Sequence, residues 1–436
     1  MTRHRLIRSK PRPSACAAVA LSILIAAACT PTANEDVTPS GDGGGGGGER
    51  ANPSIDTGDG GTFALAPFTP PADPGGGGVL FTASGEALAL TGYAFPPSGD
   101  APAFVDGWEV RFSHLLTTIG RVTLSDNPDL APGDASRVGG PIASVTGPFA
   151  VDLARSDGAN LPGKGGPGEQ AVKLAAITSA ASGAALKTDG TRYAFGFNLV
   201  GATSSAKNVN LEASALVAYR DMIGRGCVTL YVGRATWKGD KASPSCYPPA
   251  YANVPEVVDF ELCFKSPATY VNCQNPDNDP ATPFADEEHQ RGIALLTGQS
   301  VLAQVTVHTD HPFWDSVLHD TPLHFDQYAA RAVGSPDAGT PKVTLEMTQG
   351  VDYTAYQDAR GTKLPWRYCM EPATDVHPKL TGAMAFDSQA VPHATGGDPA
   401  TGLRDYYDFA TYNQSTQGHL NSDGLCFVER DYPSPR

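Results

Sequence analysis

Most of the chain after residue 79 alternates between apolar and polar residues. The longest such stretch runs from Trp108 to Leu124, where Val110, Phe112 and Leu116 share one face. A period of two residues is typical of a β-strand with one face buried, and a bend is expected near Gly120. Short turns rich in Gly, Pro, Asp and Ser separate further runs of this kind. They predict strands at 79–83, 87–94, 143–153, 170–177 and 192–200.

These patterns predict a mainly β protein, built as an antiparallel β-sandwich with a few short helices. A helix is expected near 211–223, because its apolar residues recur every three to four positions before Gly224. Two more short helices are expected within 311–333. Asp310 would cap the first, and Thr321 followed by Pro322 would begin the second. Further strands are expected at 227–237, 301–309, 342–348 and 424–429.

The N-terminal region has the pattern of an export signal. Basic residues at positions 3–12 precede an uncharged apolar run from Ala15 to Ala28. At about 14 residues this run is shorter than the ~20 that span a bilayer, and it is typical of a secretory signal peptide covering residues 1–28. The following segment, 29–78, has glycine runs at 43–48 and 75–78. Such a composition cannot bury much apolar surface, so a flexible tether is expected there.

The sequence predicts two folded segments, a β-sandwich domain at 79–205 and a β-rich domain at 206–436 with the helical hairpin. The second segment is either a separate domain or one unit with the first. Removing Cys16 with the signal, and setting Cys29 aside, leaves an even number of cysteines, which predicts disulfides in an oxidising compartment. Pairing of sequence neighbours is expected (227–246, 263–273 and 369–426). The six cysteines are Cys227, Cys246, Cys263, Cys273, Cys369 and Cys426.

Composition excludes two classes of protein. The formal net charge is −15, with 31 Lys and Arg against 46 Asp and Glu. Because binding of phosphates requires clustered basic residues, nucleic acid is not an expected partner. The 48 Gly and 37 Pro exclude a coiled coil or a helical array.

One short run carries most of the candidate chemistry. Residues 308–326 contain four His and four Asp. Imidazole and carboxylate together suit a divalent transition metal, with zinc or copper expected first. On the predicted helix His311, Asp315 and His319 lie four residues apart and share one face. The predicted ligands are His308, Asp310, His311, Asp315, His319 and His324.

Other interpretations of this run remain open. The segment is also compatible with a packing hairpin around Phe313 and Trp314, in which the histidines satisfy local hydrogen bonds. Outside it, His114 is expected in the core and His419 in a surface loop. The motifs H-E-x-x-H and G-x-S-x-G are absent, so enzymatic activity is the less favoured interpretation. An adhesion or carbohydrate-binding module and a metal-dependent hydrolase are the alternatives to a metal-binding protein.

The segment Ile25 to Cys29 resembles the lipobox of bacterial lipoproteins, which implies that Cys29 carries a lipid. Thr30 after it implies sorting to the outer membrane, on its periplasmic or its surface side. Residues 104–430 resemble uncharacterised lipoproteins of Gram-negative bacteria, through the segments 107–110, 270–278 and 308–326. The arrangement is also similar to that of periplasmic copper-binding lipoproteins. The resemblance implies a protein of the bacterial cell envelope that is held to the membrane by its lipid.

Overall fold

The structure is a computed structural model. It describes residues 52–156, 160–278, 287–317, 321–334, 339–352, 356–358, 360–370 and 402–430. The described residues belong to one compact unit. Cys29 and His319 lie outside the described residues.

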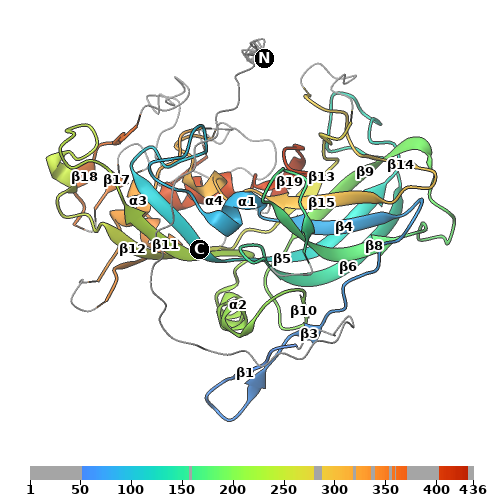
Figure 1. Cartoon of the computed structure of the whole chain (residues 1–436), viewed down its shortest axis with the longest axis horizontal. Helices are drawn as coiled ribbons and strands as arrows, with labels where there is room; N and C mark the ends of the chain where they lie inside the picture. Colours follow the sequence, from blue (N-terminus) through green and yellow to red (C-terminus); the bar gives the residue numbers. More distant parts are fainter. Residues whose placement is uncertain are drawn as a thin grey trace, which may run out of the picture. The chain divides into compact units, whose positions relative to one another are not determined.

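A large sheet forms the centre of this unit (Figure 1). Its long middle strand is β5 (Trp108–Ser125), whose first half pairs with β11 and whose second half pairs with β6 and β9. The ladder shifts register between Ile119 and Arg121, where the sequence predicted a bend at Gly120. The other strands are β3 (Ala66–Pro67), β6 (Pro141–Asp152), β9 (Asp189–Leu199), β10 (Lys207–Asn208), β11 (Thr229–Trp237), β12 (Val257–Phe264), β13 (Ala268–Val271), β14 (Ile293–Leu296), β16 (Lys342–Thr344) and β20 (Phe427–Arg430).

A smaller sheet packs on one face of the large one. Phe81 of the small sheet contacts Phe195 of β9, with ring centroids 6.1 Å apart, and both side chains are buried in one continuous core. This packing confirms the predicted β-sandwich. Neighbouring strands run antiparallel except for β4 and β15, which are parallel. In order across the sheet the strands are β19 (Gly418–Leu420), β15 (Val301–Val307), β4 (Val79–Ser84), β8 (Gln170–Ile177) and β7 (Leu161–Pro162).

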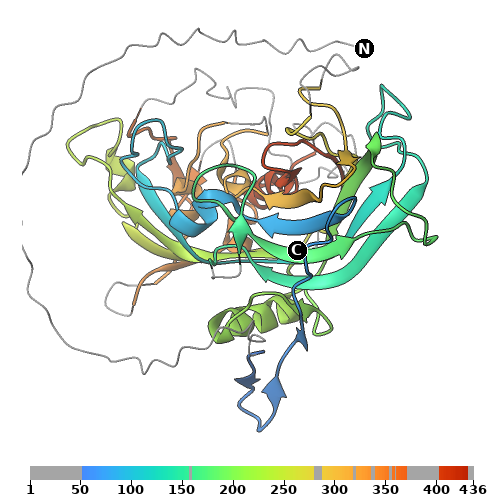
Figure 2. The ribbon, with the colours of Figure 1, turned by 45° about the vertical axis from the view of Figure 1, so that its right-hand side comes forward.

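Helix α2 (Ala213–Arg225) covers the opposite face of the large sheet, as Figure 2 shows. Its buried residues Leu216, Tyr219 and Met222 pack with Leu116 of β5 in a second apolar cluster, which confirms the helix predicted at 211–223. The remaining helices are short: α1 (Glu86–Thr91), α3 (Asp326–Ala329), α4 (Tyr406–Gln414) and the 3-10 turns η1 (Pro249–Tyr251), η2 (His311–Phe313) and η4 (Leu345–Thr348). No helix in the described ranges is both long and apolar enough to cross a membrane.

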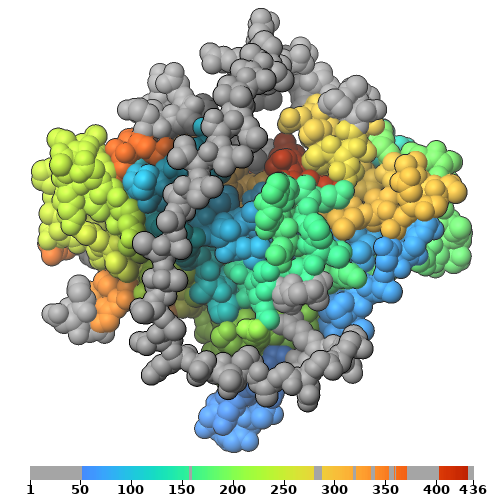
Figure 3. All heavy atoms as spheres, in the orientation of Figure 1, coloured from blue at the N-terminus to red at the C-terminus, as the bar shows by residue number. Residues whose placement is uncertain are grey.

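Segments distant in sequence share both sheets. Strands from 79–205 and from 206–436 are interleaved in the large sheet, so these two segments fold together. In the space-filling view, β14 and β15 (gold) lie beside β4 (blue) at one end, and the residues after β11 (yellow-green) form the other end (Figure 3).

The described residues include part of the segment expected as a tether. Residues 52–78 contain the hairpin of β1 (Ile55–Asp56) and β2 (Thr62–Phe63), and β3 pairs with β10. Leu65 is buried against the second apolar cluster. Because the surrounding segment is rich in glycine, the sequence pattern did not indicate the few apolar side chains that pack here. A second small hairpin joins β17 (Tyr356–Gln357) to β18 (Lys363–Leu364).

Several predicted elements differ from the structure, among them the strand predicted at 342–348, which ends at Thr344 and is followed by η4. Residues 87–94, predicted as a strand, contain α1, because a short apolar run rich in Ala and Leu is equally compatible with a helix. The first helix predicted within 311–333 is only the turn η2, and Trp314 is extended after it (φ −60°, ψ 148°). The amide of Asp315 donates to the carbonyl of Pro322 at 3.0 Å instead, and that of His324 donates to Phe313 at 2.8 Å. Thr321 caps no helix, and α3 begins only at Asp326.

The six cysteines do form three disulfides, but the pairs differ from those predicted. They join Cys227 to Cys263, Cys246 to Cys369 and Cys273 to Cys426. The predicted pair 263–273 required a hairpin between β12 and β13. In the structure β12 pairs with β11 and β13 pairs with β20. These pairings bring Cys263 to Cys227, just before β11, and Cys273, just after β13, to Cys426, just before β20.

Candidate metal centre

One end of the small sheet gathers side chains from three segments. Strands β4 and β15 are parallel with Ser84 opposite Thr306, so Glu86 and His308, two residues further on, emerge at the same level. Strand β19 runs antiparallel to β15 and places His419 opposite Thr306. Figure 1 shows α1, β15 and β19 meeting at this end. The pairing of these three strands therefore positions the site.

Three histidines converge there. His308, His311 and His419 can each offer one ring nitrogen, and the three nitrogens lie within 4.8 Å of one another. The residues are 8%, 0% and 1% exposed. The rings of His308 and His419 are stacked, with centroids 4.0 Å apart, and the ring of His311 stands 5.4 Å from each of them. We call these three residues the histidine cluster.

Hydrogen bonds fix the orientation of two of these rings. Nε2 of His308 lies 2.9 Å from the carbonyl oxygen of Ser422, which can only accept, so Nε2 carries the hydrogen. Nδ1 of His311 lies 2.7 Å from the hydroxyl of Thr416, whose own hydrogen is donated to the carbonyl of Asn413 at 2.7 Å. His311 is therefore the donor. In the neutral rings, Nδ1 of His308 and Nε2 of His311 carry the lone pairs that a metal requires.

Carboxylates surround His308 on its other side. Oε1 of Glu86 lies 3.6 Å from Nε2 of His308, and these two residues form a second group of possible metal ligands with Asp423. Burial raises the pKa of Glu86 to about 7, although the nearby His308 opposes this rise. Burial alone would lower the pKa of His308. The charges of Glu86 and Asp310, the Ser422 carbonyl and Asp423 together leave that pKa above its usual value.

The backbone at this end of the sheet is held in an uncommon conformation. Glu86, Asn421 and Ser422 have φ values of 63°, 51° and 77°, a region that residues other than glycine rarely adopt. Side chains and amides of β15 hold the turn at 421–422. The amide of Gln304 donates to Oδ1 of Asn421 and the amide of Ser422 donates to the hydroxyl of Thr306, both at 2.9 Å. Conformations that cost on the order of 1–3 kcal/mol often occur at functional sites.

An aromatic side chain covers the cluster on one side. The indole of Trp314 stacks on the ring of His311, with centroids 3.8 Å apart and 30° between planes. Its Nε1 donates to Oδ2 of Asp310 at 3.2 Å. This packing limits rotation of His311 and lowers the polarity around it.

The structure brings together only part of the predicted ligand set. His308 and His311 belong to the histidine cluster, and Oδ1 of Asp310 lies 4.0 Å from Nε2 of His311. Asp315 and His324, which were predicted ligands, lie in a different cluster. The chain is not helical beyond residue 313, where η2 ends. The side chain of Asp315 therefore does not lie on the same helix face as that of His311.

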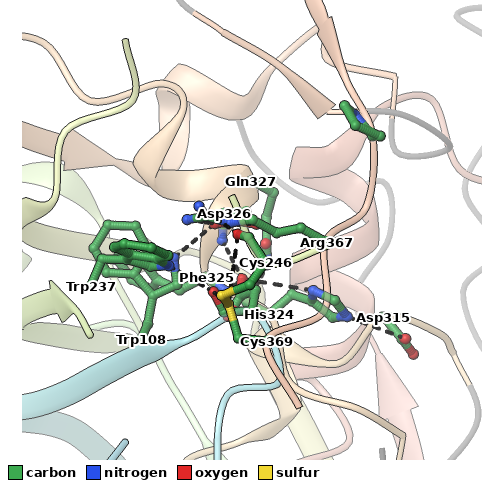
Figure 4. A network of polar contacts seen from close by, with 12 residues as sticks. Trp108, Trp237, Cys246, Asp315, His324, Phe325, Asp326, Gln327, Arg367 and Cys369 are labelled. Carbon is green, nitrogen blue, oxygen red and sulfur yellow. Dashed lines mark hydrogen bonds and ion pairs between the residues drawn. A yellow bond between two sulfur atoms is a disulfide. The ribbon is translucent and has the colours of Figure 1, made fainter. Parts of the chain in front are cut away.

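The side chains of this second cluster are buried, and Figure 4 shows how they lie around His324 and Asp326. His324 lies between Oδ2 of Asp315, at 3.6 Å, and Oδ2 of Asp106, at 3.7 Å. Burial and the neighbouring charge of Asp326 hold the pKa of Asp106 well above its usual value. Asp326 in turn accepts two hydrogen bonds from Arg367, each 2.7 Å long. We call these residues the Asp326–Arg367 cluster.

Sequence reasoning missed His419 and Glu86. His419 was expected in a surface loop, and its place beside His308 depends on the pairing of β19 with β15 across more than a hundred residues. The local pattern Gly418-His419-Leu420 was compatible with a short strand but gave no sign of its partner. Glu86 was not predicted as a ligand, because the segment 87–94 beside it was predicted as a strand and not as the helix that Glu86 begins.

Two open hollows lie elsewhere, on the large sheet. One, of about 430 Å³, is lined by residues of β5, β6, β9 and β13. The other, of about 500 Å³, is lined by residues of β5, β11, β12 and β16. None of the residues in the two ligand groups lines either hollow, so the histidine cluster is a compact site and not part of these grooves.

Comparisons with protein family models, with curated proteins and with solved structures found no match for this chain. The resemblance to lipoproteins of Gram-negative bacteria therefore stays a prediction.

Proposed function

We propose that this protein binds one divalent transition metal ion, zinc or copper, through His308, His311 and His419. The observation that carries the proposal is the convergence of three buried imidazoles, two of which have their second nitrogen fixed by a hydrogen bond. Histidines that bind metals in proteins have this kind of partner on the nitrogen that does not ligate.

The distances are suitable after small side-chain rotations. A zinc–nitrogen bond is about 2.1 Å long, so tetrahedral ligands stand roughly 3.4 Å apart. The nitrogens of the cluster lie within 4.8 Å of one another. Neutral imidazoles suit zinc and copper. The carboxylate of Asp310, whose Oδ1 lies 4.0 Å from Nε2 of His311, supplies negative charge close by, which offsets the cost of burying a cation.

We further propose that the protein is exported and anchored by a lipid on Cys29. Three disulfides support an oxidising compartment, where such bonds persist. In this proposal the signal-like residues 1–28 direct export. The lipobox-like segment marks Cys29 for the lipid that forms the anchor. Together these features describe a metal-binding protein of the bacterial cell envelope.

Substituting either His311→Ala or His419→Ala should weaken zinc binding by about 100-fold or more, because loss of a ligand costs at least as much as loss of its supporting partner. Zinc affinity is measured by competition with a chromophoric chelator. His289→Ala is the matched control, since this half-buried histidine belongs to neither ligand group. If His324→Gln or Asp315→Asn weakened zinc binding as strongly as these variants, the metal ligands would be those predicted from the sequence. The histidine cluster would then not be the binding site.

Replacing Cys29 by Ala should move the protein from the membrane fraction to the soluble extract, because the proposed lipid would have no attachment point. Fractionation of cells that express the full chain, with mass spectrometry of the mature N-terminus, measures this. Cys16→Ala is the control and should leave the protein in the membrane fraction. Equal membrane association of both variants would contradict the anchor.

A further inference from the structure

Two carboxylates on the solvent side of the histidine cluster have no part in the proposed inner site. Glu86 and Asp423 each bring an oxygen within 4.8 Å of a ring nitrogen of His308 and of each other. The side chain of Glu86 is 21% exposed and Asp423 is exposed, whereas His311 and His419 are buried. His308 is therefore shared by an outer and an inner group of ligands.

We propose that Glu86, Asp423 and His308 form an outer binding site for the same divalent cation, from which the ion passes to the histidine cluster through His308. This inference rests on the proposed function of the cluster. It assigns to the carboxylates a role in capture and release of the ion, and not in its final coordination.

The two ring nitrogens of His308 suit this role. Nε2 is the nitrogen near Glu86, at 3.6 Å, and near the Ser422 carbonyl, at 2.9 Å. Nδ1, the other ring nitrogen, carries the lone pair when Nε2 donates to Ser422, and the proposal assigns it to the inner site. An ion bound at Nε2 requires the neutral tautomer with its hydrogen on Nδ1, so Nε2 releases its proton to solvent and Nδ1 takes one up. When the ion moves inward, Nδ1 releases that proton and becomes the ligand, and Nε2 takes one up again.

The ligand types also differ between the two sites. Carboxylate oxygens bind a wide range of divalent cations, whereas imidazole nitrogens favour zinc and copper. The exposed carboxylate of Asp423 and the half-buried one of Glu86, on a chain with a net charge of −15, also attract cations from solvent. Electrostatic attraction of this kind raises association rates about 10-fold or more.

The outer site is built into the backbone and is not an accidental contact of flexible side chains. Glu86 begins α1 one residue after the end of β4, and its amide donates to the hydroxyl of Ser84 at 3.0 Å. Asp423 follows the turn at 421–422. Nδ2 of Asn421 donates to Oδ1 of Asn275 at 2.9 Å, which fixes this turn in addition to its bonds from β15. Both carboxylates are thus attached to segments with fixed positions relative to His308.

The test compares zinc exchange rates in the wild-type protein and in Glu86→Gln with Asp423→Asn. Stopped-flow mixing with ZnSO₄ gives the association rate, and mixing the loaded protein with a chelator gives the dissociation rate. Both rate constants should fall about 10-fold, while the dissociation constant stays within about twofold, because a capture site speeds both directions equally. A control with the same change of charge, Asp100→Asn with Glu429→Gln, alters two exposed carboxylates elsewhere and should leave both rates unchanged.

Three results would overturn the inference. Unchanged rates in the Glu86→Gln, Asp423→Asn protein would exclude capture by these groups. Weaker binding with faster dissociation would make the carboxylates ligands of the final site. If the wild-type protein binds no zinc, the proposed function itself fails, which is a distinguishable outcome. If the double variant does not fold, Asp423→Asn alone replaces it in the test, because this substitution alters only an exposed side chain. It should slow both rates about threefold.

Discussion

Zinc is expected to raise the free energy of unfolding of the wild-type protein by about 4 kcal/mol when the free ion is ~1,000-fold above its dissociation constant. The proposed ligands come from the end of β15, from η2 and from β19, and only the folded chain brings them together. A ligand that binds the folded state and not the unfolded state must stabilise the folded state. Urea unfolding in a zinc buffer, and again with a chelator, measures the difference.

The variant His311→Ala with His419→Ala is the control for this effect. It retains the three disulfides and the large sheet but lacks two of the three ligands. Zinc should change its free energy of unfolding by less than about 0.5 kcal/mol at the same free zinc, because its affinity is too low. Equal stabilisation of this variant and the wild-type protein would place the ion at another site.

Arg367→Ala should lower the free energy of unfolding by about 3–5 kcal/mol, the range found when one partner of a buried ion pair is removed. The side chains of Arg367 and Asp326 are 2% and 0% exposed, and their two hydrogen bonds are 2.7 Å long. Without the guanidinium, the carboxylate of Asp326 would remain buried close to Asp106. Urea unfolding at neutral pH measures the loss.

The double variant Arg367→Met with Asp326→Asn distinguishes an unpaired charge from lost packing. It removes both charges and keeps side chains of similar size. The amide oxygen introduced at position 326 can still accept from Nε1 of Trp108, which donates to Oδ1 of Asp326 at 2.8 Å in the wild-type protein. The double variant should recover at least half of the stability lost in Arg367→Ala. A loss below about 1 kcal/mol in Arg367→Ala would show that the Asp326–Arg367 cluster contributes little to stability.

The sheets were largely predictable from local pattern. A strand of eighteen residues such as β5 repeats its apolar alternation often enough to define its class and most of its length. Helix α2 has an apolar stripe that made its position clear, although the helix continues through Gly224, the predicted stop, and ends before Gly226. Segment 87–94 was ambiguous because a short apolar run of Ala and Leu fits either period, and its tertiary position decided the outcome.

The site was predictable only in part, for a physical reason. His308 and His311 are neighbours in sequence, so their proximity needed no tertiary information. The contribution of His419 depends on the β15–β19 pairing, and that of Glu86 depends on the parallel register of β4 and β15. The wrong disulfide pairs have the same origin, since strand order determines them and cysteine spacing does not.

The most direct measurement of the central claim is X-ray absorption at the zinc edge of the purified, zinc-loaded protein, together with its metal content. We expect one zinc per chain with three imidazole ligands at about 2.0–2.1 Å. His419→Ala, which leaves the predicted ligands of the 308–324 run intact, should lose this signature. No stoichiometric zinc, or a shell of oxygen ligands without imidazole, would contradict the claim.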